Sequence, residues 1–376
     1  MKIHKFKSLF IAGITVWMVA LNAATAQEIP CRAPEPVCAA RDSVFVISAF
    51  DPVASAVRIA PDLLVTNRHV TADQSAVMIT AKTGAQIPGR VIATSYEGDL
   101  VLIKAENLPS GPVLSMAKAD ENSQLFTVGT DFSRRKIRVY PPGKTLLQPS
   151  KPAPFARLHH TALSQPGNSG GALVNQAGQL VGIVTSGGEG RYEAFPISAI
   201  EKLKSLSGDT HIDKSRAIGS AIRACMDFQD KQPRRGRMSK QVGQELKNIC
   251  EVSHNRQLMD SAAVMLGRSR HLKLSRQLLE LALKRDPQAI NTRLSLITTL
   301  TFMRQHEDAL PHIRKLMSII PEDGTLQRFA IQAGKFGNDM ALANEGLALV
   351  QKHNPAQAEA AARFLAAPLR RPKKTN

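Results

Sequence analysis

The chain has 376 residues, enough for two or three domains, and 43% of them are hydrophobic, which excludes disorder throughout. Its formal net charge of +18 includes three lysines of an N-terminal leader, and the remaining excess of positive charge favours anionic surfaces or acidic partners. Aromatic residues make up only 5% of the chain, so platforms for stacking bases are scarce and no nucleic-acid partner is expected.

Residues 1–26 have the three-part pattern of a secretory signal peptide. Lysines come first, the apolar run 9–21 follows, and Ala24-Thr25-Ala26 supplies the small residues of a cleavage site. The apolar run is short for a membrane span, and no later stretch could cross a bilayer. We therefore expect cleavage after Ala26, a mature chain without a transmembrane segment, and a periplasmic or secreted protein.

The four cysteines favour disulfides over metal binding. Their number is even, and an exported protein with an even number of cysteines commonly pairs them. Sequence proximity favours Cys31–Cys38, within a proline-rich extended arm at 27–41, and Cys225–Cys250, although three pairings are formally possible. Neither a Cys-x-x-Cys pair nor a histidine cluster accompanies them, so no metal and no cofactor are expected.

Residues 42–207 are typical of a barrel or sandwich of short β-strands. Apolar runs alternate with turn signals along this region, and a helix at 198–207 closes it. The predicted strands are 44–47, 57–59, 63–66, 76–80, 86–93, 100–104, 125–128, 136–140, 155–161, 171–175, 180–185 and 192–197.

One histidine, one aspartate and one serine stand beside such strands. His69 follows an apolar strand, Asp99 precedes one, and Ser169 lies among glycines that would let backbone approach a ligand closely. Each residue alone could be structural, and the serine alone could belong to a glycine-rich hairpin turn. Together they follow the order His, Asp, Ser, which is one of the recurring chain orders of the acyl-transfer triad.

These motifs resemble the trypsin-like, chymotrypsin-fold serine endopeptidases, and among them the compact bacterial HtrA/Deg-type branch. The resemblance covers roughly residues 42–205, and it departs at Ala54-Ser55-Ala56, where the family usually has a glycine-rich turn. Its motifs are Val65-Thr66-Asn67-Arg68-His69-Val70, Gly98-Asp99-Leu100-Val101-Leu102-Ile103-Lys104, Gly167-Asn168-Ser169-Gly170-Gly171 and Ala194-Phe195-Pro196-Ile197.

The resemblance implies two six-stranded barrels with the active site between them. His69 and Asp99 would come from the first barrel and Ser169 from the second. His69 would act as base, Asp99 would orient it, and the backbone N–H groups of Gly167 and Ser169 would form the oxyanion hole.

The resemblance also implies a substrate pocket formed by Leu163, Thr185 and Ser186. These residues carry no charge, which favours cleavage after small or medium aliphatic residues. Glu189 and Glu193 are the exception, because either could reach the pocket wall and attract lysine or arginine. A further pair, His159 and His160, lies on an apolar strand, where a structural or rim role is favoured over catalysis.

Residues 208–255 form a connector with two predicted helices, 215–229 and 239–252. A Cys225–Cys250 bridge would join these helices. Closing this 25-residue interval should stabilise the chain by about 3 kcal/mol.

A repeat appears in residues 256–369. Pro287, Pro321 and Pro355 are spaced by 34 residues, and small residues stand twelve positions before each of them. The period is similar to that of the tetratricopeptide repeat. A plain helical bundle with accidental spacing is the alternative. The last helix of this region would be a cap, and a basic tail follows at 370–376.

The expected protein is therefore multidomain, an all-β double barrel followed by an all-α helical repeat domain. We expect an exported serine endopeptidase that hydrolyses protein substrates, with repeats that dock a protein partner and are not needed for chemistry. Two alternatives remain open: a proteolytically silent protein-binding scaffold, and an esterase that uses the same triad.

Overall fold

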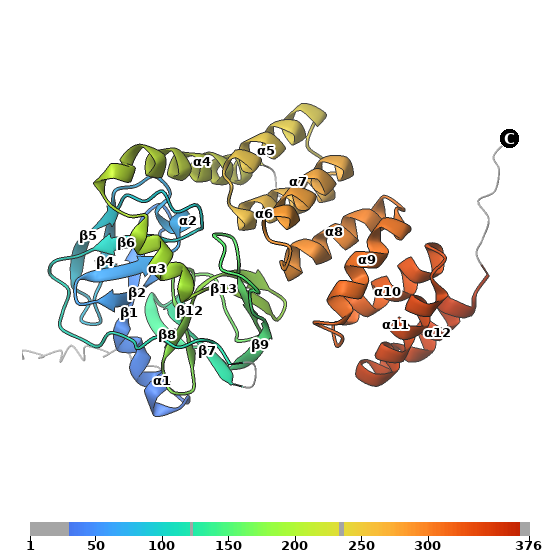
Figure 1. Cartoon of the computed structure of the whole chain (residues 1–376), viewed down its shortest axis with the longest axis horizontal. Coiled ribbons are helices and arrows are strands. Elements are labelled where there is room, and N and C mark those ends of the chain that lie inside the picture. The colour runs from blue at the N-terminus through green and yellow to red at the C-terminus, as the bar shows by residue number, and fades with distance from the viewer. Residues whose placement is uncertain (1–29, 121–122, 233–236, 369–376) are drawn as a thin grey trace, which may run out of the picture. The chain divides into compact units, whose positions relative to one another are not determined.

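The computed structural model describes residues 30–120, 123–232 and 237–368. The predicted leader at 1–26 and the basic tail at 370–376 lie outside the described residues. Strands dominate the first half of the described chain and helices the second (Figure 1).

The first six strands close into a barrel in the order β1-β2-β3-β6-β5-β4. All neighbouring pairs are antiparallel, and the buried side chains on these strands are mainly Val, Ile, Leu and Ala, which suit the pleated interior of a small barrel. The strands are β1 (Val44–Ser48), β2 (Ala54–Ala60), β3 (Leu63–Thr66), β4 (Ala76–Thr80), β5 (Gln86–Ile92) and β6 (Val101–Lys104).

The next seven strands form the second barrel, in the order β11-β12-β13-β10-β9-β7-β8. An additional pairing between β11 and β7 closes a ring of six, and β8 pairs with β7 outside that ring. The predicted double barrel is confirmed. The strands are β7 (Gln124–Asp131), β8 (Lys136–Val139), β9 (Gly143–Leu147), β10 (Leu158–His160), β11 (Ala172–Asn175), β12 (Leu180–Gly188) and β13 (Arg191–Pro196), and α3 (Ser198–Ser205) follows them.

Strand β9 and the N-terminal arm are among the parts of the barrel region that differ from the sequence prediction. Strand β9 was not predicted, because Pro141, Pro142 and Gly143 mark a turn and the strand begins on that glycine. The N-terminal arm is also not extended throughout. A short helix, α1 (Glu35–Ala39), begins directly after Pro34, and the Cys31–Cys38 disulfide ties it to the preceding residues.

The helical region begins with the two connector helices. These are α4 (Ile212–Asp230) and α5 (Lys240–Val252), and the Cys225–Cys250 disulfide joins them. Ser239 caps α5 by accepting a hydrogen bond from the Val242 N–H group. Both helices and both disulfides thus stand where the sequence analysis expected them.

Six helices in pairs and one terminal helix follow. Ser275, Ala309 and Ala343 are all buried, and each lies near the start of the second helix of its pair, where a small side chain lets the helices approach closely. This arrangement fits a helical repeat region. The helices are α6 (Arg256–Arg268), α7 (Leu272–Arg285), α8 (Ile290–Phe302), α9 (His306–Met317), α10 (Gly324–Phe336), α11 (Met340–His353) and α12 (Ala358–Ala366). Among the described residues, none of the helices has the length and apolar character needed to cross a membrane.

Candidate active site

The His69 side chain is held by Asp99. Strand β3 pairs with β6, with Thr66 opposite Val101, so the end of one strand lies beside the start of the other. His69 then falls in α2 (Arg68–Thr71), a single helical turn directly after β3. Its Nδ1 is 2.6 Å from Asp99 Oδ2, and its backbone N–H group donates to Asp99 Oδ1 at 2.8 Å. These contacts fix the ring orientation from two directions.

Burial and charge act in opposite directions on this pair. Burial alone would lower the pKa of His69, but the charge and hydrogen bond of Asp99 outweigh it and raise that pKa above its usual value. Burial alone would raise the pKa of Asp99, but His69 outweighs it and lowers that pKa. The pair therefore favours an ionised carboxylate beside a histidine that is more basic than usual.

Ser169 approaches this pair through Thr185. The Ser169 hydroxyl donates to the Thr185 carbonyl at 3.3 Å, and the Thr185 hydroxyl donates to Asp99 Oδ2 at 3.4 Å. Between the described side chains of Ser169 and His69 the structure has no hydrogen bond. The three predicted residues thus converge on one place, with the serine hydroxyl turned to a backbone carbonyl.

The loop around Ser169 depends on glycine. Gly167 and Gly170 have backbone φ angles of +92° and +80°, which residues other than glycine rarely adopt. A Cβ at Gly170 would also overlap Thr66 Oγ1 and the Ser55 carbonyl oxygen. The backbone N–H groups of Gly167 and Ser169 donate no hydrogen bond to any described residue, so both remain available to an acceptor from outside the chain.

Ser55 joins the two barrels beside this loop. Its hydroxyl donates to the Gly167 carbonyl at 2.8 Å and accepts from the Thr130 N–H group at 2.8 Å. Its own N–H group donates to the Ser169 carbonyl at 2.9 Å. Ala54-Ser55-Ala56, where the family usually has a glycine-rich turn, forms the start of strand β2. Its serine holds the loop around Ser169 in place.

Comparison with known proteins shows similarity to peptidases. A family model described as a trypsin-like peptidase domain matches residues 54–183, a segment that includes His69, Asp99 and Ser169. The chain is 29% identical over 164 residues to "Probable periplasmic serine endoprotease DegP-like" of Pseudomonas putida, across 40% of this chain and 34% of that protein. The barrel domain is an HtrA-like, trypsin-like peptidase domain.

Other relatives show the same partial coverage. "Serine protease HtrA-like" of Staphylococcus aureus is 28% identical over 172 residues, across 40% of this chain and 22% of that protein. The solved structure "HtrA-type protease AlgW with tripeptide" is 24% identical, with a TM-score of 0.41, and the match covers 45% of this chain and 61% of that one. The chain thus spans about a third or less of the length of these curated relatives.

The predicted pocket residues of the peptidase domain have different surroundings. Thr185 lies beside Ser169, as described above, and Ser186 follows it on β12. Leu163 is half-buried, and its N–H group donates to the Pro141 carbonyl at 3.2 Å. The place of Leu163 in a substrate pocket stays a prediction.

Neither glutamate named in the sequence analysis is a free charge. Glu189 is exposed in the β12–β13 turn and pairs with Arg191 at 2.7 Å. Glu193 is buried and forms an ion pair with Arg256. Burial alone would raise the pKa of Glu193, but Arg256 and His159 outweigh it and lower that pKa to about 2. Glu193 therefore carries its charge, and a guanidinium of the helical region neutralises it.

His159 and His160 lie on β10 and are fully buried. Neither ring nitrogen of either side chain has a hydrogen-bond partner among the described residues. Burial, together with His159, lowers the pKa of His160 to about 3, so that ring is neutral at neutral pH. Because consecutive residues of a strand point to opposite faces, the two rings lie on opposite sides of β10, and His159 Nδ1 is 3.8 Å from Glu193 Oε1. Among the described residues no group of three or more His, Cys, Asp or Glu side chains is placed to hold a metal ion.

Sequence reasoning missed the support that the connector gives to the His69 turn. The Arg68 guanidinium is buried and donates to the carbonyls of Thr94 at 3.2 Å and Tyr96 at 3.1 Å, and to that of Ser215 on α4 at 3.3 Å. Gly219 on the same helix lies so close to the Ala72 carbonyl that a Cβ there would overlap it. The arginine in the motif was visible in the sequence, but nothing there indicated its distant partner.

Proposed function

We propose that the protein is a serine endopeptidase that hydrolyses peptide bonds of protein substrates with Ser169 as nucleophile. The observation that carries this proposal is the convergence of the His69–Asp99 pair on a glycine loop that holds Ser169 and two unpaired N–H groups. The HtrA-like character of the peptidase domain supports the same reaction class. Because only part of each relative is matched, the activity of the whole chain is inferred from its own site.

The chemistry follows from the roles that these groups can take. The Ser169 hydroxyl rotates from the Thr185 carbonyl towards His69 Nε2, which removes its proton as the oxygen attacks the scissile carbonyl carbon. Asp99 stabilises the imidazolium that forms and keeps the ring in one orientation. The N–H groups of Gly167 and Ser169 donate to the oxyanion, and losing such a donor costs on the order of 100- to 1,000-fold in rate. His69 then protonates the leaving amine, and water hydrolyses the acyl-enzyme.

The helical region would supply protein docking. A cavity of about 710 Å³ lies among α6, α7 and α8, with the exposed Val264 and Phe302 beside Arg268 and Arg270. Arg268 and Arg270 have no ion-pair partner among the described residues, and exposed apolar side chains rimmed by such cations suit a protein segment that carries acidic residues. The paired helices and their 34-residue period support tetratricopeptide-like repeats as the source of this groove.

Export would place the protein in an oxidising compartment. Two disulfides close within the described residues, and such bonds persist mainly in secreted and periplasmic proteins. The leader pattern at 1–26 and the word "periplasmic" in the name of the Pseudomonas relative support the same location.

Digestion of an unfolded protein by wild type and Ser169→Ala tests the proposal. We expect the variant to lose cleavage by several orders of magnitude while its unfolding temperature stays close to that of wild type. Ser205→Ala is the matched control, because that serine is exposed on α3 and bonds only the Lys202 carbonyl. Equal residual cleavage by wild type and Ser169→Ala would contradict the proposal.

The same digest identifies the preferred residue before the cleaved bond. Because Glu193 is already neutralised by Arg256 and Leu163 carries no charge, we expect cleavage after aliphatic residues such as Ala, Val or Leu. Dominant cleavage after Lys or Arg would show that a carboxylate faces the pocket after all.

A further inference from the structure

Glu193 is a buried carboxylate held by partners from two parts of the chain. Its Oε2 accepts hydrogen bonds from Ser186 Oγ at 3.0 Å and from Arg256 Nη2. Its Oε1 accepts from Asn291 Nδ2 at 3.2 Å and lies 3.8 Å from His159 Nδ1. Ser186 and His159 belong to the second barrel, whereas Arg256 and Asn291 belong to the helical region.

Arg256 joins this carboxylate to the helices. It is the first residue of α6 and only 2% exposed. Its Nη1 donates to Asp260 Oδ2 and Thr292 Oγ1, both at 3.1 Å, and its Nε is 3.4 Å from Asp286 Oδ2. A planar guanidinium can serve several acceptors at fixed angles, which the flexible ammonium of lysine does not do. Loss of Arg256 would leave buried carboxylates without their cation.

The other side of Glu193 leads to Ser169. Ser186 is opposite Glu193 in the β12–β13 ladder, and the register shifts between Val184 and Ser186, so that Thr185 lies at the irregularity. Thr185 is the residue that accepts from Ser169 and donates to Asp99. The regular pairing resumes at Ser186 and Glu193, directly after the irregularity, and the side-chain bond between these two residues reinforces the pairing next to Thr185.

We infer that Arg256 is a positioning residue of the proposed peptidase: through Glu193 it fixes Ser186, and thereby the segment of β12 beside Ser169. The inference rests on the proposed function and goes beyond it, because the helical region then contributes to the active site as well as to docking. Arg256 touches neither the triad nor a substrate. It acts only through the two residues between it and Thr185.

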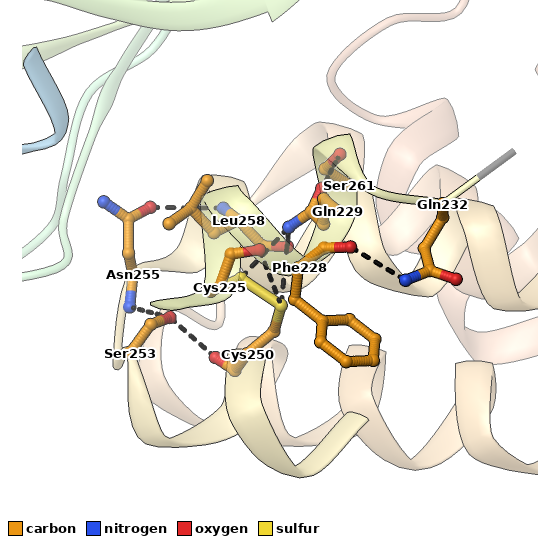
Figure 2. Close-up of a disulfide and its surroundings, with 9 residues drawn as sticks. All are labelled: Cys225, Phe228, Gln229, Gln232, Cys250, Ser253, Asn255, Leu258 and Ser261. Atoms are coloured by element: carbon orange, nitrogen blue, oxygen red, sulfur yellow. Dashed lines mark hydrogen bonds between the residues drawn. A yellow bond between two sulfur atoms is a disulfide. The ribbon is translucent and has the colours of Figure 1, made fainter. Parts of the chain in front are cut away.

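A hydrogen-bond network leads from the Cys225–Cys250 disulfide to Asn255 and Leu258 at the start of α6 (Figure 2). The Ser253 hydroxyl donates to the Cys250 carbonyl at 2.6 Å and accepts from the Asn255 N–H group at 3.2 Å. The Asn255 side chain then caps α6 by accepting from the Leu258 N–H group at 3.2 Å. The residue that follows the cap is Arg256, so the bridge between α4 and α5 indirectly sets where the guanidinium lies.

A double-mutant cycle in the full chain tests the inference with Arg256→Met, Ser186→Ala and both together. The readouts are kcat/KM for a peptide that extends several residues on both sides of the cleaved bond, and the rate at which a small fluorophosphonate labels Ser169. We expect each single variant to lower kcat/KM by about tenfold, the effect of one lost hydrogen bond at a reacting strand, and labelling to change less than about threefold.

The decisive result is the double variant. If Arg256 acts through Ser186, the double variant is no worse than Arg256→Met alone, because the second substitution removes a contact already lost. Multiplied losses, or a wild-type kcat/KM in Ser186→Ala, would overturn the inference. Arg256→Lys replaces Arg256→Met in the same cycle if the methionine variant does not fold.

Arg276→Met is the matched control. Arg276 lies on α7 and pairs with Glu280 and Asp308, both in the helical region, so its loss removes an arginine and two ion pairs away from the barrel. We expect Arg276→Met to keep the wild-type kcat/KM. If it lowers kcat/KM as much as Arg256→Met does, the effect of Arg256 is a general one on folding and not a positioning of β12. If the wild-type protein neither cleaves nor labels, both the proposed function and this inference are wrong. If the wild type is active but the losses of the two single variants multiply in the double variant, only this inference is wrong.

Discussion

At His69, a buried imidazole gains basicity mainly from the Asp99 carboxylate, with a smaller contribution from Asp51. Burial and the nearby Arg157 guanidinium both lower its pKa, and Asp99 outweighs them. An imidazole must be neutral to act as a base, so activity should fall as the pH decreases through the His69 pKa. Because that pKa is raised above its usual value of about 6.5, the acidic limb of the rate profile should have its midpoint above that pH.

Asp99→Asn tests this balance. We expect kcat to fall on the order of 10⁴-fold, because an amide cannot stabilise the imidazolium or hold the correct tautomer. The remaining activity should persist to lower pH than in wild type, because burial and Arg157 still lower the His69 pKa while the main group that raises it is gone and only the weaker charge of Asp51 still opposes them. The measurement is kcat/KM across roughly pH 5 to 9. Asp131→Asn, a carboxylate bonded to Ser133 at 2.8 Å, is the control, and an acidic limb that does not move in Asp99→Asn would contradict the account.

The residues of the site differ in how far the sequence could predict them. His69, Asp99 and Ser169 stand at strand ends in a recognisable order, so their convergence could be anticipated. The contacts of Ser55 and Thr185 could not, because each joins residues that are far apart in the chain, such as Ser55 and Gly167. Ser55 instead looked like a departure from the expected turn.

At the scale of elements, the connector supports the first barrel and is tied to the helices that follow it. Helix α4 packs against α2 at Gly219, and its Ser215 carbonyl accepts from Arg68, so it supports the turn that holds His69. The Cys225–Cys250 bridge ties the same helix to α5. Periodicity predicted both helices to within a few residues, whereas β9 and α1 were missed because proline and glycine obscured them.

Replacing both Cys225 and Cys250 with serine should lower the free energy of unfolding by about 3 kcal/mol, because the unfolded chain regains the entropy of a 25-residue separation. Denaturant unfolding followed by circular dichroism of the helices measures this loss. The double substitution of Cys31 and Cys38, which are separated by seven residues, is the comparison and should cost about 1 kcal/mol less. An unchanged unfolding midpoint without the Cys225–Cys250 bridge would show that the bridge does not stabilise the fold.

At the scale of the whole molecule, the helical region contacts the barrels at several places, among them the ion pair between Arg191 and Asp323 and the hydrogen bond from the Ser150 N–H group to Gln288 Oε1 at 2.8 Å. Two further contacts bear on the site. One is the support of α2 by α4, and the other is the ion pair between Arg256 and Glu193. The sequence predicted two independent units, because polar residues 63 positions apart give no sign that they pair in the interior. A chain ending near residue 207 would lose the Arg256 guanidinium that pairs with Glu193 and the α4 carbonyl that accepts from Arg68, so the division into separate chemistry and docking units needs to be tested in the full chain.

The central claim is that Ser169 is an activated nucleophile, and covalent labelling tests it most directly. A fluorophosphonate added to the folded full-length protein should attach to a single residue, which peptide mass spectrometry should identify as Ser169. Labelling should be abolished in Ser169→Ala, strongly slowed in His69→Ala, and unchanged in Ser205→Ala. Absence of labelling in the folded wild type, or labelling that persists in Ser169→Ala, would contradict the claim.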